Sequence, residues 1–311
     1  MKVAASQYKI RMLKSYHDFE AHIREHIESA VAQGAELLLL PEFFTVELMT
    51  LEKYKADSKA DFTRIFTHFA KTYTKPMKET CAALAKEYGI VLAAGSHFSY
   101  DEKEDRYYNS AFVFMPDQRI HLQNKIHPSY ELVYNKDLTS PGCSLDVFQA
   151  MDVTFGVSVC YDGSFPEIAR ILTNLGADVI LAPTACLDEW GRSRNILFSQ
   201  ARASENQVFV INSHLIGSIP FPPHLPYGFS FTGQSGIYSP IQPMIGTPNG
   251  IMKQGEPNVE TVVSADINLD YLHHIRSNGH NRNREDRRPE FYRSYEAPFA
   301  HASAGESGGR V

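Results

Sequence analysis

The sequence predicts an α/β fold in which two sheets are flanked by helices, and three observations support this. Apolar segments of strand length alternate with segments whose apolar residues recur at helical spacing. Glycine and proline residues separate these segments. The segment 34–41 (GAELLLLP) recurs in similar form as 176–183 (GADVILAP), each time after a predicted strand and helix. This approximate repeat indicates two similar halves of one domain.

In the first half the patterns predict strands and helices in alternation, closed by a hairpin. Apolar residues at Phe19, Ile23 and Ile27 mark the first helix, which Gly34 ends. A turn at 116–118 (PDQ) joins the hairpin strands. The predicted elements are strand 3–8, helix 15–33, strand 35–41, helix 75–88, strand 90–96 and hairpin strands 109–115 and 120–125. The intervening insert 47–73 is expected to form either a lid or an exposed helical pair.

The second half repeats the order and then changes composition. It is predicted to contain strand 153–160, helix 165–175, strand 177–183, helix 193–205 and strand 208–213. Six arginines then fall between 276 and 293, interleaved with Glu285, Asp286 and Glu290. Residues 296–311 are rich in Ala, Ser and Gly and carry no core pattern. We therefore expect a domain at 1–275 and a tail at 276–311 that packs at a subunit interface or is partly disordered.

Composition excludes several classes of protein. A net charge of −6 disfavours a nucleic-acid partner, and the acids among the tail arginines disfavour one there. No apolar run approaches the roughly 18 residues of a membrane span. The N-terminus has no apolar stretch like that of a secretory signal and reads as a first strand. The four cysteines match no CxxC pattern, so we expect reduced thiols and a cytoplasmic location.

Three reactive side chains stand at the ends of predicted strands. Glu42 follows LLLLP, Lys125 ends the strand 120–125, and Cys160 ends the strand 153–160. Taken singly, each has an ordinary interpretation as a solvated carboxylate, a charged turn or a small buried hydrophobe. Asp162-Gly163 after Cys160 predicts a sharp turn into a helix near Pro166. Such a turn exposes a nucleophile, and the helix N-terminus favours its anionic form.

Together these motifs resemble the nitrilase superfamily of carbon–nitrogen hydrolases over nearly all of residues 1–275. The matching segments are LLLLPE, NKIHPSYE, GVSVCYDGSFPE, GADVILAPTA and RASENQVFVINS. The resemblance implies a four-layer αββα sandwich and an enzyme. It implies that Glu42 is the general base, that Cys160 attacks the carbonyl carbon to give a thioester, and that Lys125 stabilises the oxyanion together with the Tyr161 backbone N–H. Lys125 as proton donor is the alternative role. Glu131 matches a second glutamate that orients the lysine and contacts the substrate.

The residues after the nucleophile favour the amidase-type branches. The chain reads Cys160-Tyr161-Asp162, whereas the superfamily's true nitrilases typically read Cys-Trp-Glu. We therefore expect a small-molecule amide rather than a nitrile as substrate, and an N-carbamoyl substrate stays open. Loops near the strand ends are expected to set specificity. The candidate substrate contacts are Phe43, Phe44, Tyr130, Tyr134, Tyr161, Trp190 and Arg194.

Two of these predictions have alternatives. An arginine at 192 or 194 is suited to clamp a substrate carboxylate, or it pairs with Asp188 or Glu189 at the surface. His22 and His26 stand at i, i+4 as metal ligands do, but no third ligand lies near them in the sequence. We therefore expect neither a metal nor a cofactor.

Other functions remain as alternatives. A papain-like Cys–His pair and a non-catalytic binding protein on the same fold are both weaker, because Glu42, Lys125 and Cys160 are all present. No GxSxG elbow indicates a serine hydrolase. Cys81, Cys143 and Cys186 have no such neighbours in the sequence and are interpreted as structural. The resemblance also implies a homodimer or higher homo-oligomer.

Overall fold

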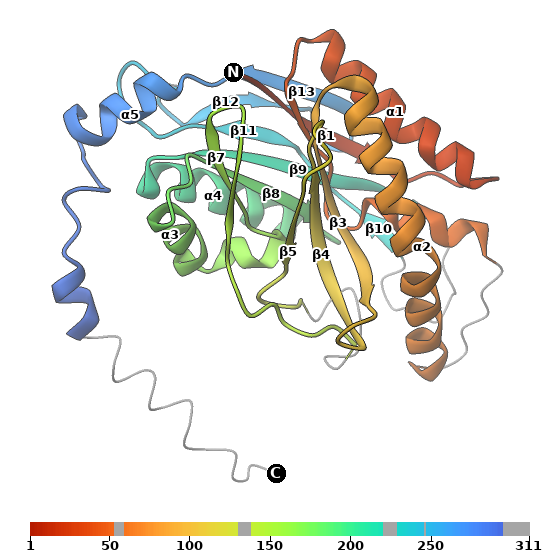
Figure 1. Ribbon diagram of the computed structural model, residues 1–311. Helices are drawn as coiled ribbons and strands as arrows, with labels where there is room; N and C mark the ends of the chain where they lie inside the picture. The colour runs from red at the N-terminus through yellow and green to blue at the C-terminus, as the bar shows by residue number, and fades with distance from the viewer. Residues whose placement is uncertain (53–58, 130–137, 220–228, 246, 295–311) are drawn as a thin grey trace.

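The computed structural model describes residues 1–52, 59–129, 138–219, 229–245 and 247–294. Figure 1 shows two sheets lying between two groups of helices. The helices are α1 (Tyr16–Ala32), α2 (Lys59–Tyr88), α3 (Pro166–Asn174), α4 (Glu189–Asn206) and α5 (Leu269–Asn278), with the 3-10 helices η1 (Phe44–Leu51) and η2 (Cys160–Ser164). None of the described helices is long and apolar enough to cross a membrane.

The strands run in the order β5-β4-β3-β2-β1-β9-β8-β7-β6. In chain order their bounds are β1 (Lys2–Lys9), β2 (Leu37–Leu39), β3 (Val91–Asp101), β4 (Arg106–Phe114), β5 (Ile120–Asn124), β6 (Val147–Ala150), β7 (Val153–Val157), β8 (Val179–Ala185), β9 (Phe209–Ile219), β10 (Phe229–Phe231), β11 (Gly236–Tyr238), β12 (Ile251–Gln254) and β13 (Thr261–Asp266).

Strand β1 joins the two sheets. Its residues Val3 to Ala5 lie between β2, which is parallel to it, and β13, which is antiparallel. Its last residues, Gln7 to Lys9, instead pair with β9 of the second sheet. In the second sheet β9 lies between β8 and β11. Each half of the chain therefore supplies most of one sheet, as the internal repeat predicted.

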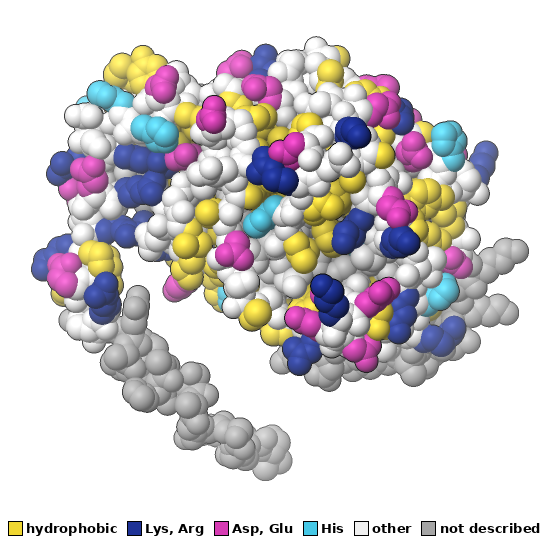
Figure 2. Space-filling view, viewed as in Figure 1, with side chains coloured by type: hydrophobic (Ala, Val, Ile, Leu, Met, Phe, Trp, Pro, Cys, Tyr) yellow, Lys and Arg dark blue, Asp and Glu magenta, His cyan; other side chains and the backbone are white. Residues whose placement is uncertain are grey.

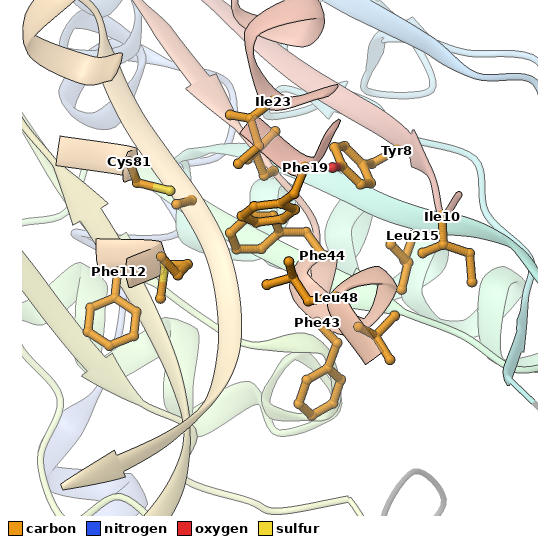
Figure 3. Packing of buried hydrophobic residues seen from close by; sticks show 14 of the residues in the cluster. Tyr8, Ile10, Phe19, Ile23, Phe43, Phe44, Leu48, Cys81, Phe112 and Leu215 are labelled. Carbon is orange, nitrogen blue, oxygen red and sulfur yellow. The ribbon is translucent and has the colours of Figure 1, made fainter. Parts of the chain in front are cut away.

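Three apolar layers separate the helices and sheets. One lies between the two sheets and includes Val3, Leu39, Phe155 and Ile211. A second lies under α3 and α4. The third lies under α1 and α2, where Phe19 and Ile23 of α1 meet Phe44 of η1 (Figure 3). The order is helix, sheet, sheet, helix, which confirms the predicted four-layer αββα sandwich.

The short strand β2 shows why the run of leucines occurs. Leu38 and Leu40 pack in the layer under α1 and α2, whereas Leu37 and Leu39 pack between the sheets. A strand covered on both faces requires apolar residues at every position. Helix α1 begins at the N-cap Ser15, whose capping box with Asp18 satisfies the first backbone N–H groups.

Several boundaries differ from the sequence predictions. Helix α2 begins at Lys59 rather than 75, and Pro76 lies inside it. Its residues Ile65, Phe66 and Phe69 are buried, so the alternative of an exposed helical pair within 47–73 is wrong for this part. The strand predicted at 153–160 ends at Val157 because the chain turns before Cys160. Strands β10 to β13 and helix α5 were not predicted.

The segment after residue 275 contacts the second half of the fold. Arg276 Nη1 lies 2.6 Å from Asp178 Oδ1, and Arg284 Nη2 donates to Thr173 O at 2.9 Å. Figure 2 shows Lys and Arg side chains gathered over α5 and the segment after it, with acidic side chains among them. Arg282 pairs with Asp286 at 2.7 Å. The domain boundary at 275 and the role of the tail stay predictions, and residues 295–311 lie outside the described ones.

Candidate functional site

Glu42 follows β2 and is completely buried. Its Oε1 accepts hydrogen bonds from Lys125 Nζ at 2.7 Å and from Asn109 Nδ2 at 2.8 Å. Its Oε2 accepts one from the Ala185 backbone N–H at 3.1 Å. A buried carboxylate is costly unless it is paired and hydrogen-bonded, and here both oxygens have partners. Glu42 is thus held in a single position at the end of the first sheet.

A glycine on the neighbouring strand allows this position. Gly95 of β3 has φ +53°, and a Cβ added to it would lie 1.9 Å from Pro41 O, directly before Glu42. The pairing of β3 with β4 shifts register here, between Ala93 and Ser96. The close contact of the two backbones therefore depends on the missing side chain.

We expect Gly95→Ala to lower the free energy of unfolding by about 3 kcal/mol, from overpacking of about 1–3 kcal/mol and left-handed strain of about 1–2 kcal/mol. Hydrolytic activity should also fall, because relief of the contact displaces Glu42. Gly89→Ala is the matched control, since Gly89 has φ +62° but nothing within 4 Å of the added Cβ. Urea unfolding measures both variants, and an equal loss in the two would contradict the steric explanation.

Lys125 follows β5 and is 1% exposed. Besides Glu42, its Nζ contacts Ser129 Oγ at 3.1 Å. Burial by itself lowers the pKa of Lys125, but the acidic groups Glu42, Cys160 and Asp162 outweigh it and raise the pKa above its ordinary value. Lys125 is therefore an ammonium at neutral pH, as a group that stabilises an oxyanion must be.

Cys160 stands on the sharp turn that the sequence predicted. Its φ of 48° is in the left-handed region, which side-chain-bearing residues rarely adopt and which is common at functional sites. Helix α3 packs closely on the strand before this turn, because a Cβ on Gly156 of β7 would lie 2.9 Å from Leu172 Cδ2 of α3. The Cys160 thiol is directed at Ala185 O, 3.7 Å away. Ala185 therefore contacts Glu42 through its N–H and Cys160 through its carbonyl.

The Cys160 thiol is protonated at rest. A hydrogen bond with Cys186, burial and the negative charge of Glu42 together raise the pKa of Cys160 well above its usual value. Lys125 acts in the opposite direction but is outweighed. A nucleophile in this state requires a base beside it, and Glu42 is the carboxylate in place.

Asp162 connects the lysine segment to the cysteine turn. Its carboxylate is buried and accepts hydrogen bonds from the backbone N–H groups of Ile126 at 3.2 Å and His127 at 2.8 Å. The His127 ring lies 2.9 Å from the same carboxylate and stacks on Phe165. These contacts fix the residues after Lys125 against the turn that carries Cys160. The sequence indicated only a turn at Asp162.

Other site residues also escaped the sequence analysis. Asn109 and Ala185 bind Glu42 but lie in apolar strands that read as ordinary core. Cys186, interpreted as structural, lies beside Cys160 and raises the pKa of its thiol, and it accepts a hydrogen bond from Asn195 Nδ2 at 3.3 Å. Cys186 follows Ala185 at the end of β8, and β8 pairs with β7, the strand before Cys160. A prediction of that pairing would have placed Cys186 near Cys160.

The predicted substrate contacts have different outcomes. Tyr161 is 46% exposed and packs edge-on against Phe165. Trp190 is 77% exposed and Arg194 is exposed on α4. Arg192 pairs with Glu189 at 3.8 Å, which agrees with the surface-pair alternative. Tyr130, Glu131 and Tyr134 lie outside the described residues, so their contacts with substrate stay predictions.

Comparison with known proteins agrees with this arrangement. The carbon-nitrogen hydrolase family model matches residues 2–277 of the chain. This chain belongs to the carbon–nitrogen hydrolase family. Within the nitrilase superfamily it falls in the amidase-type branch, so the enzyme predicted from the motifs is confirmed at that level.

Named relatives show the range of the family. The chain is 30% identical to "Probable hydrolase YhcX" of Bacillus subtilis over 294 residues, 94% of this chain but only 54% of that protein. It is 31% identical to "Omega-amidase NIT2-B" of Xenopus laevis over 259 residues, 80% of this chain and 83% of the relative. The solved carbon–nitrogen hydrolase of Helicobacter pylori has a TM-score of 0.76 at 22% identity and covers 95% of this chain and 98% of its own. That structure shares the fold.

Proposed function

We propose that this carbon–nitrogen hydrolase cleaves a small-molecule amide through a thioester on Cys160. The contact that carries the proposal is Ala185, which binds the Glu42 carboxylate and the Cys160 thiol at once, with Lys125 2.7 Å from the same carboxylate. Base, nucleophile and cation therefore lie together at the strand ends, where the chemistry needs them.

The reaction follows from these contacts. Glu42 takes the thiol proton, and the Cys160 sulfur bonds to the amide carbonyl carbon, which places negative charge on the carbonyl oxygen. The Lys125 ammonium stabilises that charge. Glu42 returns the proton to the leaving nitrogen, the C–N bond breaks, and ammonia or an amine departs. Glu42 then takes a proton from water, and the resulting hydroxide attacks the thioester carbon. The C–S bond breaks, the acid departs, and Glu42 returns the proton to the Cys160 sulfur.

Relatives support an amide as substrate. A relative 31% identical is named an omega-amidase. A mutant of an amidase of Nesterenkonia, which shares the fold at 22% identity, carries a Michael adduct of acrylamide at its active-site cysteine. Another relative, from Pyrococcus abyssi, is named a nitrilase and is 30% identical. Nitriles and N-carbamoyl compounds therefore belong in the test.

The test is ammonia release from four matched sets: simple amides, ω-amides of dicarboxylates, N-carbamoyl compounds and nitriles. We expect at least one amide to be turned over about tenfold faster than its matched nitrile. Added hydroxylamine should divert the acyl group to a hydroxamate, because it attacks a thioester readily. The Cys160→Ala protein serves as the blank. Faster nitrile turnover would overturn the substrate class, and product without hydroxamate would overturn the thioester. We also propose that the chain forms a homodimer or higher homo-oligomer, and a monomer by light scattering would contradict this.

A further inference from the structure

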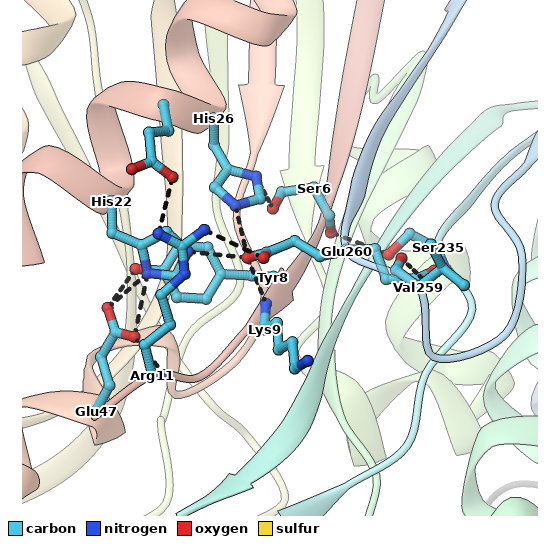
Figure 4. A network of polar contacts seen from close by, with 12 residues as sticks. Ser6, Tyr8, Lys9, Arg11, His22, His26, Glu47, Ser235, Val259 and Glu260 are labelled. Atoms are coloured by element: carbon cyan, nitrogen blue, oxygen red, sulfur yellow. Dashed lines mark hydrogen bonds and ion pairs between the residues drawn. The ribbon is translucent and has the colours of Figure 1, made fainter. Parts of the chain in front are cut away.

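Two buried histidines and a glutamate lie together beside Tyr8 (Figure 4). His22 and His26 stand one turn apart on α1 and are 1% and 5% exposed. Glu260, directly before β13, is far from both in the sequence. Its Oε1 lies 2.9 Å from His22 Nε2 and 3.3 Å from His26 Nε2. One possible ligand atom from each of the three residues lies within 4.8 Å of the other two.

We propose that His22, His26 and Glu260 bind a divalent transition-metal ion of the zinc class. Zinc bonds of about 2.0–2.1 Å in a tetrahedron place neighbouring ligand atoms about 3.3 Å apart. The observed separations of 2.9 and 3.3 Å are within a few tenths of an ångström of that value. Two imidazoles and one carboxylate are a donor set that zinc accepts, with water completing the fourth position.

The outer contacts of both imidazoles support this proposal. Metal-binding histidines usually donate their other ring N–H to a carboxylate or another acceptor, which fixes the tautomer and the ring orientation. His22 Nδ1 lies 3.1 Å from both carboxylate oxygens of Glu47. His26 Nδ1 lies 2.9 Å from Ser6 Oγ. With a proton on each Nδ1, both Nε2 lone pairs face Glu260.

The carboxylate is oriented as well. Arg11 Nη2 holds Glu260 Oε2 at 3.1 Å and leaves Oε1 directed at the histidines, with one backbone donor from Lys9 at 3.2 Å. The Glu260 side chain is 27% exposed, which gives an ion and its water a route from solvent. The side chains of the candidate site are therefore already oriented to bind an ion, and the site is accessible from solvent.

The ion would have a structural role. Glu47 lies in η1, the helix that follows Glu42, and also accepts hydrogen bonds from Tyr8 OH and the Arg11 backbone N–H at 3.0 Å. A metal at His22 would thus tie α1, the start of β13 and η1 together. The pattern of His22 and His26 was visible in the sequence. Glu260 was not, because only the fold brings it to them.

The test is titration of the untagged, chelator-treated full chain with Zn²⁺ by calorimetry and with Co²⁺ by visible absorption. We expect one ion per chain, a higher Tm, and a cobalt spectrum of nitrogen and oxygen ligands without thiolate charge transfer. His26→Gln and Glu260→Gln should weaken binding at least about 100-fold, and Glu47→Gln about 10–100-fold. His17→Gln, an exposed histidine on the same helix, is the matched control and should bind normally.

Binding by Cys160→Ala separates this site from the candidate catalytic one and should be unchanged. The proposal is overturned if the wild-type chain binds no stoichiometric ion, if His26→Gln binds as wild type does, or if cobalt shows thiolate ligands. Circular dichroism establishes that each variant is folded. If a variant fails to fold, the wild-type stoichiometry and cobalt spectrum still decide the question.

Discussion

Replacement of Cys160 by alanine should abolish hydrolysis and leave the fold unchanged. Removal of a covalent nucleophile typically costs kcat on the order of 10⁴- to 10⁶-fold, because the remaining groups have no attacking atom to act on. The thiol contacts Ala185 O at 3.7 Å and lies beside Cys186, so its loss removes a single sulfur atom from the packing. We expect Tm to change by at most a few degrees, since the loss of one small buried group costs on the order of 1 kcal/mol.

Rapid quench and mass spectrometry provide the direct measurement. The wild-type chain should carry an acyl group on the peptide that contains Cys160, and the variant should carry none. Cys143→Ala is the matched control, because Cys143 is a free, exposed cysteine and should leave kcat unchanged. An acylated Cys160→Ala protein, or steady turnover by it, would exclude Cys160 as nucleophile.

The sequence predicted the fold well where local and tertiary signals agree. The run of leucines before Glu42 required a strand covered on both faces, and β2 is such a strand. The predicted start of helix α2 was wrong, because burial of its apolar face outweighed the local preference against proline inside a helix. The helix predicted from residue 75 begins at Lys59 instead, because Phe66 and Phe69 are buried under the same helix, which continues through Pro76. Strands β10, β11 and β12 have 3, 3 and 4 residues, too few for a periodic pattern.

The candidate site was predictable from the sequence only in its reactive side chains. Glu42, Lys125 and Cys160 each end an apolar segment, which makes them conspicuous in sequence. Their partners Asn109 and Ala185 act through an amide and a backbone N–H from other strands. Backbone donors have no signature in a sequence, and an asparagine inside a strand becomes informative only once the strand order is known. Glu260 was missed for the same reason, because only the fold brings it beside His22.

The buried pair of Glu42 and Lys125 should show strong coupling in stability. Glu42→Gln leaves an ammonium buried without its counter-ion, and Lys125→Met leaves a carboxylate in the same position. Each single change should lower the free energy of unfolding by about 3–5 kcal/mol. The double variant removes both charges together, so its loss should be smaller than the sum of the single losses by about 2 kcal/mol or more. Glu79→Gln, which opens the exposed Lys75–Glu79 pair, should cost at most about 0.5 kcal/mol.

The pH dependence of the free energy of unfolding tests whether Glu42 raises the pKa of Lys125. In the wild type the pKa of Lys125 is raised, so its stabilisation is fully present below the unfolded value of about 10.4 and is lost only as pH rises through the folded pKa. In Glu42→Gln burial becomes the dominant influence and lowers the pKa of Lys125. The unfolded state then binds more protons, so the stability of this variant should rise between about pH 7 and 10 relative to wild type. Urea unfolding across that range measures the difference. If the two stabilities run parallel, Glu42 is not the group that keeps Lys125 charged, and the assignment of Lys125 as an oxyanion-stabilising cation loses its physical basis.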